Sequence, residues 1–262
     1  MKFILLIVII AVIVAYFRKK KNKTILTESV AASDIDEMDT LLQDNISFYK
    51  RLDENERQSF QKRVKHFLAT TRITPVGEVV ITPLDRLYVA SSAIIPIFHF
   101  TDWAYNNLDE VLIYPGTFTK DFDIEDEEKN VLGMVGDGAM HRMMILSLPS
   151  LRAGFEHNGA GNTAIHEFVH LLDKADGATD GVPEYMIPKN LVTPWIRQMH
   201  KAIKDIRNDD SDINPYAGTN EAEFFAVVSE YFFQKPQFLK EQHPAIFKIL
   251  EEVYKTTETN DN

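Results

Sequence analysis

Apolar residues recur at helical spacing in several separate parts of the chain, and elsewhere they form short runs typical of strands. Capping patterns mark the start of two of the helices. Asp53 with Glu56 has the spacing of a capping box, and Thr82 with Pro83 has the pattern of an N-cap and first helical residue. We therefore expect helices over residues 53–70, 82–95, from 162 or 163 onward, 220–233 and 247–254.

Short apolar runs bounded by proline and glycine predict strands before the later helices. These runs are residues 76–81, 110–114 and 143–148, whereas the glycine-rich segment 133–138 has the composition of a turn. The strand over 143–148 is expected to lie at an edge of the sheet that is open to backbone pairing. Strands followed by a block of helices indicate an α+β fold with a small sheet on one side of the site.

The amino terminus has a different character from the rest of the chain. Residues 3–17 are an uninterrupted apolar run, and residues 1–23 carry six basic residues and no acidic ones. A cleaved signal peptide and a buried helix are the alternatives. The basic stretch after the run opposes the first, and the lack of any polar face opposes the second. We expect a single-pass membrane anchor over 1–23, with the chain that follows in the cytoplasm by the positive-inside rule.

Two further segments follow this anchor: a polar, acidic linker over 24–44 and a folded domain over 45–262. The whole chain has a net charge of −11 despite its basic start, so its body is strongly acidic. Such a body repels nucleic acid, and we expect no nucleic-acid partner. Cysteine is absent, which excludes disulfides, thiolate metal ligands and a cysteine nucleophile. Any metal site must therefore use histidine and carboxylate ligands.

The chemical signal is concentrated in the segment His166-Glu167-Phe168-Val169-His170. Histidines four residues apart share one face of a helix, so both imidazoles can reach one ion. Glu167 follows the first histidine, and this offset lets its carboxylate address a metal-activated water. The pattern predicts Zn²⁺ as cofactor and a hydrolytic reaction with Glu167 as general base.

The third metal ligand stays open on the residues alone. A catalytic zinc site uses three protein ligands and keeps one position free. Asp176 lies six residues after the second histidine, a spacing used by some zinc peptidases, but Asp173 stands where their pattern has glycine. Glu221, Glu223 and Glu230 lie on the apolar helix predicted over 220–233, where inward-facing acids require a reason. Ala226, three residues after Glu223, would let two helices approach closely, which favours Glu223 over the other acids.

The order and content of these segments resemble the MtfA (Mlc titration factor A) zinc peptidases, a bacterial family of the gluzincin type. The resemblance runs from about Ile46 to Tyr254. It rests on HEFVHLLDKADG at 166–177 with the GVP that follows, and on NPYAGTNEAEFFAVVSEYFF at 214–233. A looser match covers EVLIYPGTF at 110–118.

The resemblance implies a zincin-like domain in which His166, His170 and Glu223 bind zinc and Glu167 is the general base. It also implies that Tyr216 stabilises the oxyanion, as a phenol donating to the oxygen that gains charge can do. From the residues alone, Tyr216 can equally be interpreted as a tyrosine that flanks a turn and has no catalytic role. Asp173, nearby on the histidine helix, is a candidate to orient a ligand imidazole or an ordinary residue near a helix end.

Two functions of different classes follow from the resemblance. The first is a peptidase of peptide or protein substrates, an aminopeptidase by analogy, tethered to the inner face of a bacterial inner membrane. The second is a regulatory zinc-binding module that captures a protein partner such as a transcriptional repressor. Glu167 favours the first, since structural zinc binding does not need that carboxylate. A metal-dependent hydrolase of non-peptide substrates fits the same ligands, and residues 1–23 lie outside the region that soluble members share.

Overall fold

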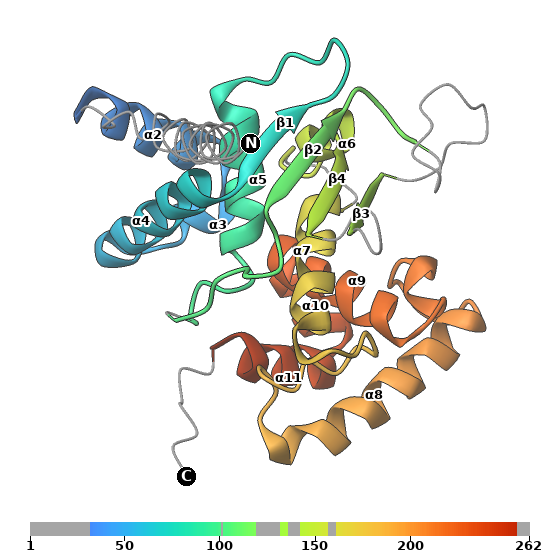
Figure 1. The fold of residues 1–262 in the computed structure, drawn as a ribbon. Coiled ribbons are helices and arrows are strands. Elements are labelled where there is room, and N and C mark those ends of the chain that lie inside the picture. The colour runs from blue at the N-terminus through green and yellow to red at the C-terminus, as the bar shows by residue number, and fades with distance from the viewer. Residues whose placement is uncertain (1–31, 101, 119–131, 136–141, 157–160, 256–262) are drawn as a thin grey trace, which may run out of the picture. The chain divides into compact units, whose positions relative to one another are not determined.

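The computed structural model describes residues 32–100, 102–118, 132–135, 142–156 and 161–255 (Figure 1). The predicted anchor, residues 1–23, lies outside them, whereas the later part of the predicted linker forms helix α2 (Ala32–Asn45). Among the described residues, no helix combines the length and the apolar character that crossing a membrane requires. The chain divides into two compact units, Met1–Thr40 and Leu41–Asn262, and the architecture below is that of the second.

A four-stranded mixed sheet forms one part of this unit, in the strand order β1-β2-β4-β3. Strands β1, β2 and β4 run parallel, and β3 is antiparallel to β4, with Met134 of β3 opposite Ile145 of β4. The strands are β1 (Arg72–Pro75), β2 (Glu110–Tyr114), β3 (Gly133–Val135) and β4 (Met143–Ser147). Together with the helices that follow, the sheet confirms the α+β class.

The sheet corrects three expectations. The strand predicted over 76–81 is wrong, because β1 lies earlier and Gly77, with φ +68°, turns the chain just after it. The turn predicted over 133–138 is wrong in its first half, since residues 133–135 are strand β3. The edge role predicted for 143–148 is also wrong. β4 lies between β2 and β3, and β3 is the outer strand in the part of the chain that the structure describes.

The helices confirm most of the pattern. Both predicted helix starts are capped. Asp53 and Glu56 exchange 2.9 Å hydrogen bonds, and Thr82 and Asp85 exchange hydrogen bonds of 2.7 and 3.2 Å. The helices are α3 (Ser47–Lys50), α4 (Glu54–Thr70), α5 (Pro83–Ile94), α6 (Leu148–Ala153), α7 (Thr163–Asp173), α8 (Lys189–Arg207), α9 (Glu221–Gln234), α10 (Pro236–Gln242) and α11 (Pro244–Lys255). Two 3₁₀ turns, η2 (Lys174–Asp176) and η3 (Pro215–Gly218), follow α7 and precede α9.

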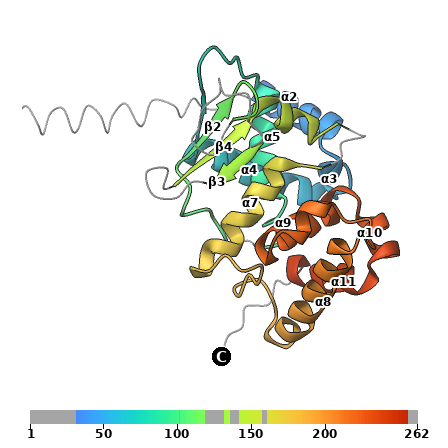
Figure 2. The ribbon, with the colours of Figure 1, turned by 90° about the vertical axis from the view of Figure 1, so that its right-hand side faces the viewer.

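Helix α7 lies between the sheet and the carboxyl-terminal helices, as both ribbon views show (Figures 1 and 2). It packs against α9 on one side and against α5 and β3 on the other. Phe168 anchors its apolar face, with its ring 5.8 Å from that of Phe67 and 5.1 Å from that of Tyr105. This packing leaves the face that carries the histidines turned toward α9.

Helix α9 is held equally firmly from its far side. Phe224 and Phe225 are buried and pack on Trp195 of α8. Their ring centroids lie 5.8 and 5.9 Å from that of Trp195. The buried hydroxyl of Tyr254 in α11 donates a 2.7 Å hydrogen bond to Ser229. Two rigid helices, α7 and α9, therefore supply the side chains that meet at the site.

Candidate metal centre

The first turn of α7 fixes the position of the motif. Asn162 is fully buried and caps the helix, its side-chain oxygen accepting from the N–H of Ile165 at 3.0 Å. Its side-chain amide donates to the carbonyl of Gly154 at the end of α6, also at 3.0 Å. With the start of the helix pinned in this way, His166 and His170 project from one face one turn apart, as their spacing predicts.

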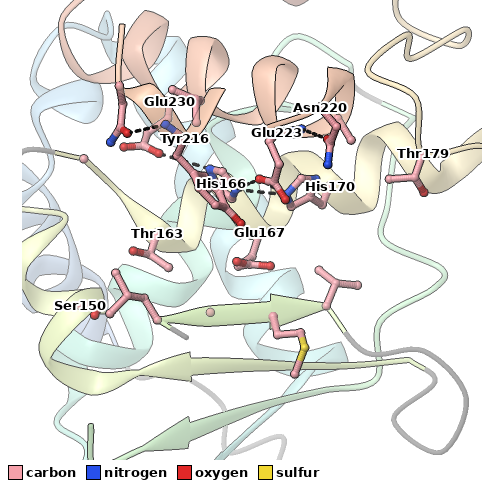
Figure 3. Close-up of a pocket in the computed structure, with 18 of the residues that line it drawn as sticks. Ser150, Thr163, His166, Glu167, His170, Thr179, Tyr216, Asn220, Glu223 and Glu230 are labelled. Atoms are coloured by element: carbon pink, nitrogen blue, oxygen red, sulfur yellow. Dashed lines mark hydrogen bonds and ion pairs between the residues drawn. The ribbon is translucent and has the colours of Figure 1, made fainter. Parts of the chain in front are cut away.

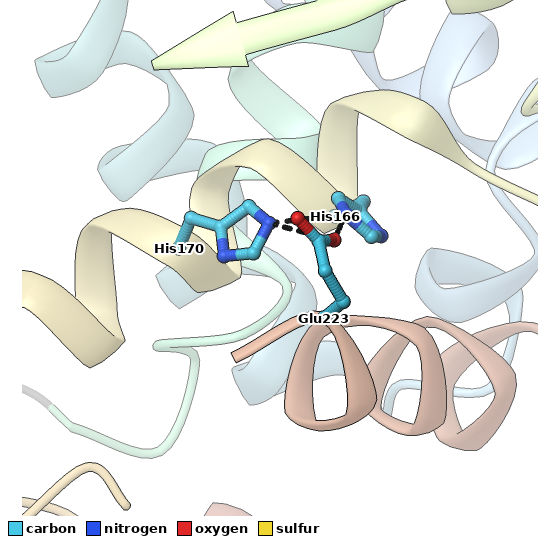
Figure 4. A group of neighbouring side chains, drawn as sticks. All are labelled: His166, His170 and Glu223. Atoms are coloured by element: carbon cyan, nitrogen blue, oxygen red, sulfur yellow. Dashed lines mark hydrogen bonds and ion pairs between the residues drawn. The ribbon is translucent and has the colours of Figure 1, made fainter. Parts of the chain in front are cut away.

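The first turn of α9 brings a carboxylate to the two imidazoles. Asn220 caps this helix and accepts from the N–H of Glu223 at 2.9 Å. The Glu223 side chain reaches back to α7, where its Oε2 lies 3.0 Å from His166 Nε2 and 3.3 Å from His170 Nε2 (Figure 4). The two Nε2 atoms are 3.1 Å apart. Among the described residues, these three side chains form a group able to hold a metal ion.

The geometry of this group fits a small divalent cation. Tetrahedral bonds of about 2.0–2.1 Å separate two ligand atoms on the same ion by about 3.3 Å. The three separations here, 3.0, 3.1 and 3.3 Å, are close to that value. Two imidazole nitrogens and one carboxylate oxygen are also a ligand set that zinc enzymes use, and they leave a fourth position for substrate or water.

The electrostatics of the group also favour a cation. Burial lowers the pKa of His166, but hydrogen bonds with Glu223 and Glu230 and the charge of Glu167 outweigh it and raise the pKa to about 10. Burial acts to raise the pKa of Glu223, yet the two histidines hold it well below its ordinary value. The pocket of carboxylates thus stabilises positive charge at His166, where a bound cation would replace the proton.

Glu167 projects into the same cleft on the side of strand β3 and points toward that strand (Figure 3). It is only 6% exposed, and this burial raises its pKa, although both histidines and the backbone N–H of Val135 act to lower it. Gly133 makes the approach of β3 possible. A Cβ at this position would lie 2.7 Å from Glu167 Cγ and 2.8 Å from Thr163 Cγ2. A buried carboxylate with a raised pKa beside a metal group suits proton transfer.

Tyr216 completes the group from η3. Its ring centroid lies 6.0 Å from that of His166, and its side chain is 54% exposed toward the cleft. Burial of its inner part, the charge of Glu223 and a hydrogen bond with that carboxylate raise its pKa to about 12. The phenol therefore keeps its proton at neutral pH and can donate it to an oxygen placed beside the metal group.

All five of these side chains line one open cleft of about 1020 Å³. Strand β3 forms one wall and the first turns of α9 form the other, with α7 as the floor (Figure 3). The cleft extends past the histidines in both directions, to Ser150 beyond one side and to Thr179 beyond the other. Its volume and shape suit an extended peptide segment.

Comparison with known proteins identifies the family to which this arrangement belongs. The sequence profile of the glucose-regulated metallo-peptidase M90 family matches residues 17–255. The chain belongs to this family. It is therefore a zinc metallopeptidase of the M90 class, and the predicted family resemblance is confirmed.

The chain is also similar to individual proteins. "Mlc titration factor A" of Pectobacterium atrosepticum is 29% identical over 220 residues, which cover 78% of this chain and 80% of the relative. The protein of the same designation in Yersinia enterocolitica is 30% identical, with the same coverage. A crystal structure from Bacteroides caccae, designated a zinc-binding metallo-peptidase, is 14% identical and covers 77% of this chain and 85% of its own, with a TM-score of 0.36.

The other acids considered as third ligand have different places in this M90 structure. Asp176 accepts from the backbone N–H groups of Ala178 and Glu184 and thus shapes the loop after α7. Glu221 is half exposed and lies 3.5 Å from His200. Glu230 lies outside the metal group but contacts the other ring nitrogen of His166, at 3.5 Å.

Asp173 has a role different from the expected contact with an imidazole. It is fully buried, and its Oδ2 accepts from the N–H of Gly181 at 2.9 Å, while its Oδ1 has no hydrogen-bond partner among the described residues. The carbonyl of Gly181 in turn accepts from the indole of Trp195 at 2.7 Å. Asp173 therefore ties the end of α7 to the loop that leads to α8.

Sequence reasoning missed the strand wall of the site. Val135 donates to the Glu167 carboxylate and Gly133 admits that carboxylate beneath the strand, yet both residues fall in a segment read as a turn. Alternation is hard to recognise in three residues. The usable signal was the glycine itself, since a glycine inside a strand marks a close approach of another group.

Proposed function

We propose that the protein hydrolyses peptide bonds with a zinc ion held by His166, His170 and Glu223. The observation that carries the proposal is the cluster of these three ligand atoms on the floor of an open cleft, with a buried carboxylate next to it. Zinc in such a site lowers the pKa of water and polarises a carbonyl group. The family assignment supports zinc over other divalent ions. The domain is, in this proposal, zincin-like.

The side chains divide the proton transfers between them. Glu167 takes a proton from the attacking water, and its raised pKa lets it hold that proton and deliver it to the leaving amine. Tyr216 donates a hydrogen bond to the carbonyl oxygen as it gains negative charge. His166 and His170 hold their ring nitrogens toward the ion because α7 is fixed by its cap and its packed face.

Strand β3 is the expected guide for the substrate. It is the outer strand of the sheet as described, and it lines the cleft beside Glu167. An extended peptide that pairs with such an edge gains backbone hydrogen bonds and places its carbonyl groups at regular intervals along the cleft. This assigns to β3 the role that the sequence had suggested for β4.

The resemblance to the MtfA peptidases further suggests aminopeptidase activity, which remains a proposal, as does tethering to the bacterial inner membrane by residues 1–23. A second candidate function is capture of a transcriptional regulator. The two relatives described above are designated Mlc titration factor A, a designation that implies binding of Mlc by those proteins. For this chain we propose a protein regulator as an additional partner beside the peptide substrate.

Zinc content and peptide hydrolysis of the full-length chain test the main proposal. We expect about one zinc per chain in the wild type. Glu167→Gln should keep the zinc and lose activity by about 10²–10⁴-fold, because only the proton carrier is removed. Glu223→Ala should lose the zinc.

Glu221→Gln is the matched control for zinc content, since Glu221 lies two residues away in the same helical turn and outside the metal group. Full zinc content in Glu223→Ala would refute the ligand assignment. Zinc binding by the wild type without cleavage of any member of a broad peptide library would favour the capture function instead.

A further inference from the structure

The face of α9 that carries Glu223 presents a second acid to the same histidine. Glu230 lies seven residues after Glu223, two helical turns along, and therefore on the same side of the helix. Glu223 Oε2 is 3.0 Å from Nε2 of His166, and Glu230 Oε2 is 3.5 Å from Nδ1. The imidazole is thus held between two carboxylates of one helix (Figure 3).

Both oxygens of Glu230 are occupied. While Oε2 faces the imidazole, Oε1 accepts a 2.7 Å hydrogen bond from the backbone N–H of Asn162, the cap of α7. Glu230 therefore links the start of α7 and the ring of His166 through a single side chain.

The chain makes room for this carboxylate at Gly161. A Cβ on Gly161 would collide with Glu230 Oε1 and lie 3.1 Å from its Cδ. Any larger residue at this position must displace the Glu230 head group from the N–H that it binds. Gln234, four residues further along α9, makes a contact that can be compared with that of Glu230. Its side-chain amide donates to the Gly154 carbonyl at 3.2 Å.

We propose that Glu230 is a positioning residue that fixes the tautomer and the orientation of His166 for metal binding. An acceptor at Nδ1 keeps the ring proton there and leaves the Nε2 lone pair toward the metal group. The inference rests on the proposed metal site and adds a residue to it. It also explains why a helix as apolar as α9 retains an inward acid at this position.

Glu230→Gln tests the role of the carboxylate with little change in shape. A glutamine can accept from Asn162 only while turning its NH₂ group toward Nδ1, which favours the tautomer with its proton on Nε2, facing the metal group. If the glutamine amide is turned the other way, its NH₂ group faces the backbone N–H of Asn162, and two donors oppose each other. We expect the full-length variant to bind zinc about 10–100-fold more weakly than the wild type in competition with a chromophoric chelator.

Gly161→Ala removes the same contact without altering Glu230, so it tests the inference even if Glu230→Gln fails to fold. It should weaken zinc binding to a similar extent, and the double variant should bind little more weakly than either single one. Gln234→Ala is the matched control. It loses a contact between α9 and the end of α6, and its zinc affinity should stay within about twofold of wild type.

Nitrogen-15 NMR of histidine-labelled, zinc-loaded protein adds a readout that general loosening would not move. His166 should carry its proton on Nδ1 in the wild type and lose that signature in Glu230→Gln. Wild-type zinc affinity in Glu230→Gln, or an equal loss in Gln234→Ala, would overturn the inference while leaving the zinc peptidase proposal intact. Absence of zinc binding in the wild type would overturn both.

Discussion

The buried Asp173 provides a quantitative test of the energetics around α7. Among the described residues, its Oδ1 is buried without a hydrogen-bond partner, and its Oδ2 accepts one hydrogen bond, from the backbone N–H of Gly181. Burial raises the pKa of Asp173 from 3.8 to about 6, against the lowering effect of that hydrogen bond and with a contribution from Asp180. Above this pKa the folded protein must hold a poorly solvated charge.

The pH dependence follows from proton linkage. Between about pH 4 and pH 6 the folded state binds more protons at this site than the unfolded chain does, so the free energy of unfolding falls as pH rises. The folded pKa exceeds the ordinary one by roughly two units at 1.36 kcal/mol each, so this carboxyl group costs up to about 3 kcal/mol at neutral pH. The cost disappears below about pH 4, where the group is protonated in both states.

Asp173→Asn removes the titration while keeping an acceptor for Gly181. We expect the stability of the variant relative to wild type to rise by up to about 3 kcal/mol between pH 4 and pH 7. An unpaired amide N–H₂ can add a cost of about 1–3 kcal/mol, but that cost is the same at every pH. The change with pH, and not the offset, therefore carries the prediction.

The measurement is chemical denaturation of the metal-free protein in the presence of a chelator. Tryptophan fluorescence follows unfolding, and one of the two tryptophans, Trp195, is buried next to Gly181. Free energies of unfolding for both proteins at pH 4, 5, 6 and 7 give the difference curve. A flat difference, or one that falls with pH, would refute the argument that burial governs this carboxyl group.

Other predictions concern the reacting groups. Tyr216→Phe should lower kcat by about 10²–10³-fold with zinc content unchanged, and an unaltered kcat would exclude the oxyanion role. Gly133→Ala should destabilise the fold by about 1–3 kcal/mol and reduce kcat, because its Cβ falls 2.7 Å from Glu167 Cγ; thermal unfolding and kinetics would check both effects. Zinc binding at pH 7 should release about one proton per ion in calorimetry across several buffers, since the pKa of His166 is raised to about 10. Net release near zero would show that His166 is neutral before the metal arrives.

The local parts of the site were predictable from the sequence because their geometry is set within one helical turn. The spacing of His166 and His170 and the offset of Glu167 belong to α7 alone. The third ligand was not predictable from the residues, since four acids had suitable positions and the choice depends on how α9 packs on α7. The residues favoured Glu223 without excluding the other three acids, and the family resemblance singled it out. The structure brings Glu223 to both histidines.

In the fold, too, the features set by neighbouring residues were predictable and those set by distant partners were not. Capping boxes involve neighbours three residues apart, and the helix starts after Asp53 and Thr82 agree with the prediction. Strand β3 depends on pairing with β4, whose paired residues lie nine to thirteen positions away along the chain, and the glycine in β3 made the segment resemble a turn. Helix α8 was missed because Pro194 marks its segment as irregular, although this proline lies inside the first turns of the helix.

The separation of the ligands along the chain has a consequence for biosynthesis. His166 and Glu223 are 57 residues apart, and Glu223 takes its position only when α9 has packed against α7. A nascent chain that has emerged from the ribosome with the complete histidine motif still has only two of the three ligands. Helix α11, which supports α9 through Tyr254, is translated later still. If the proposed ligands hold the metal, the order of synthesis would therefore delay assembly of the hydrolytic centre until α9 and α11 have folded onto α7.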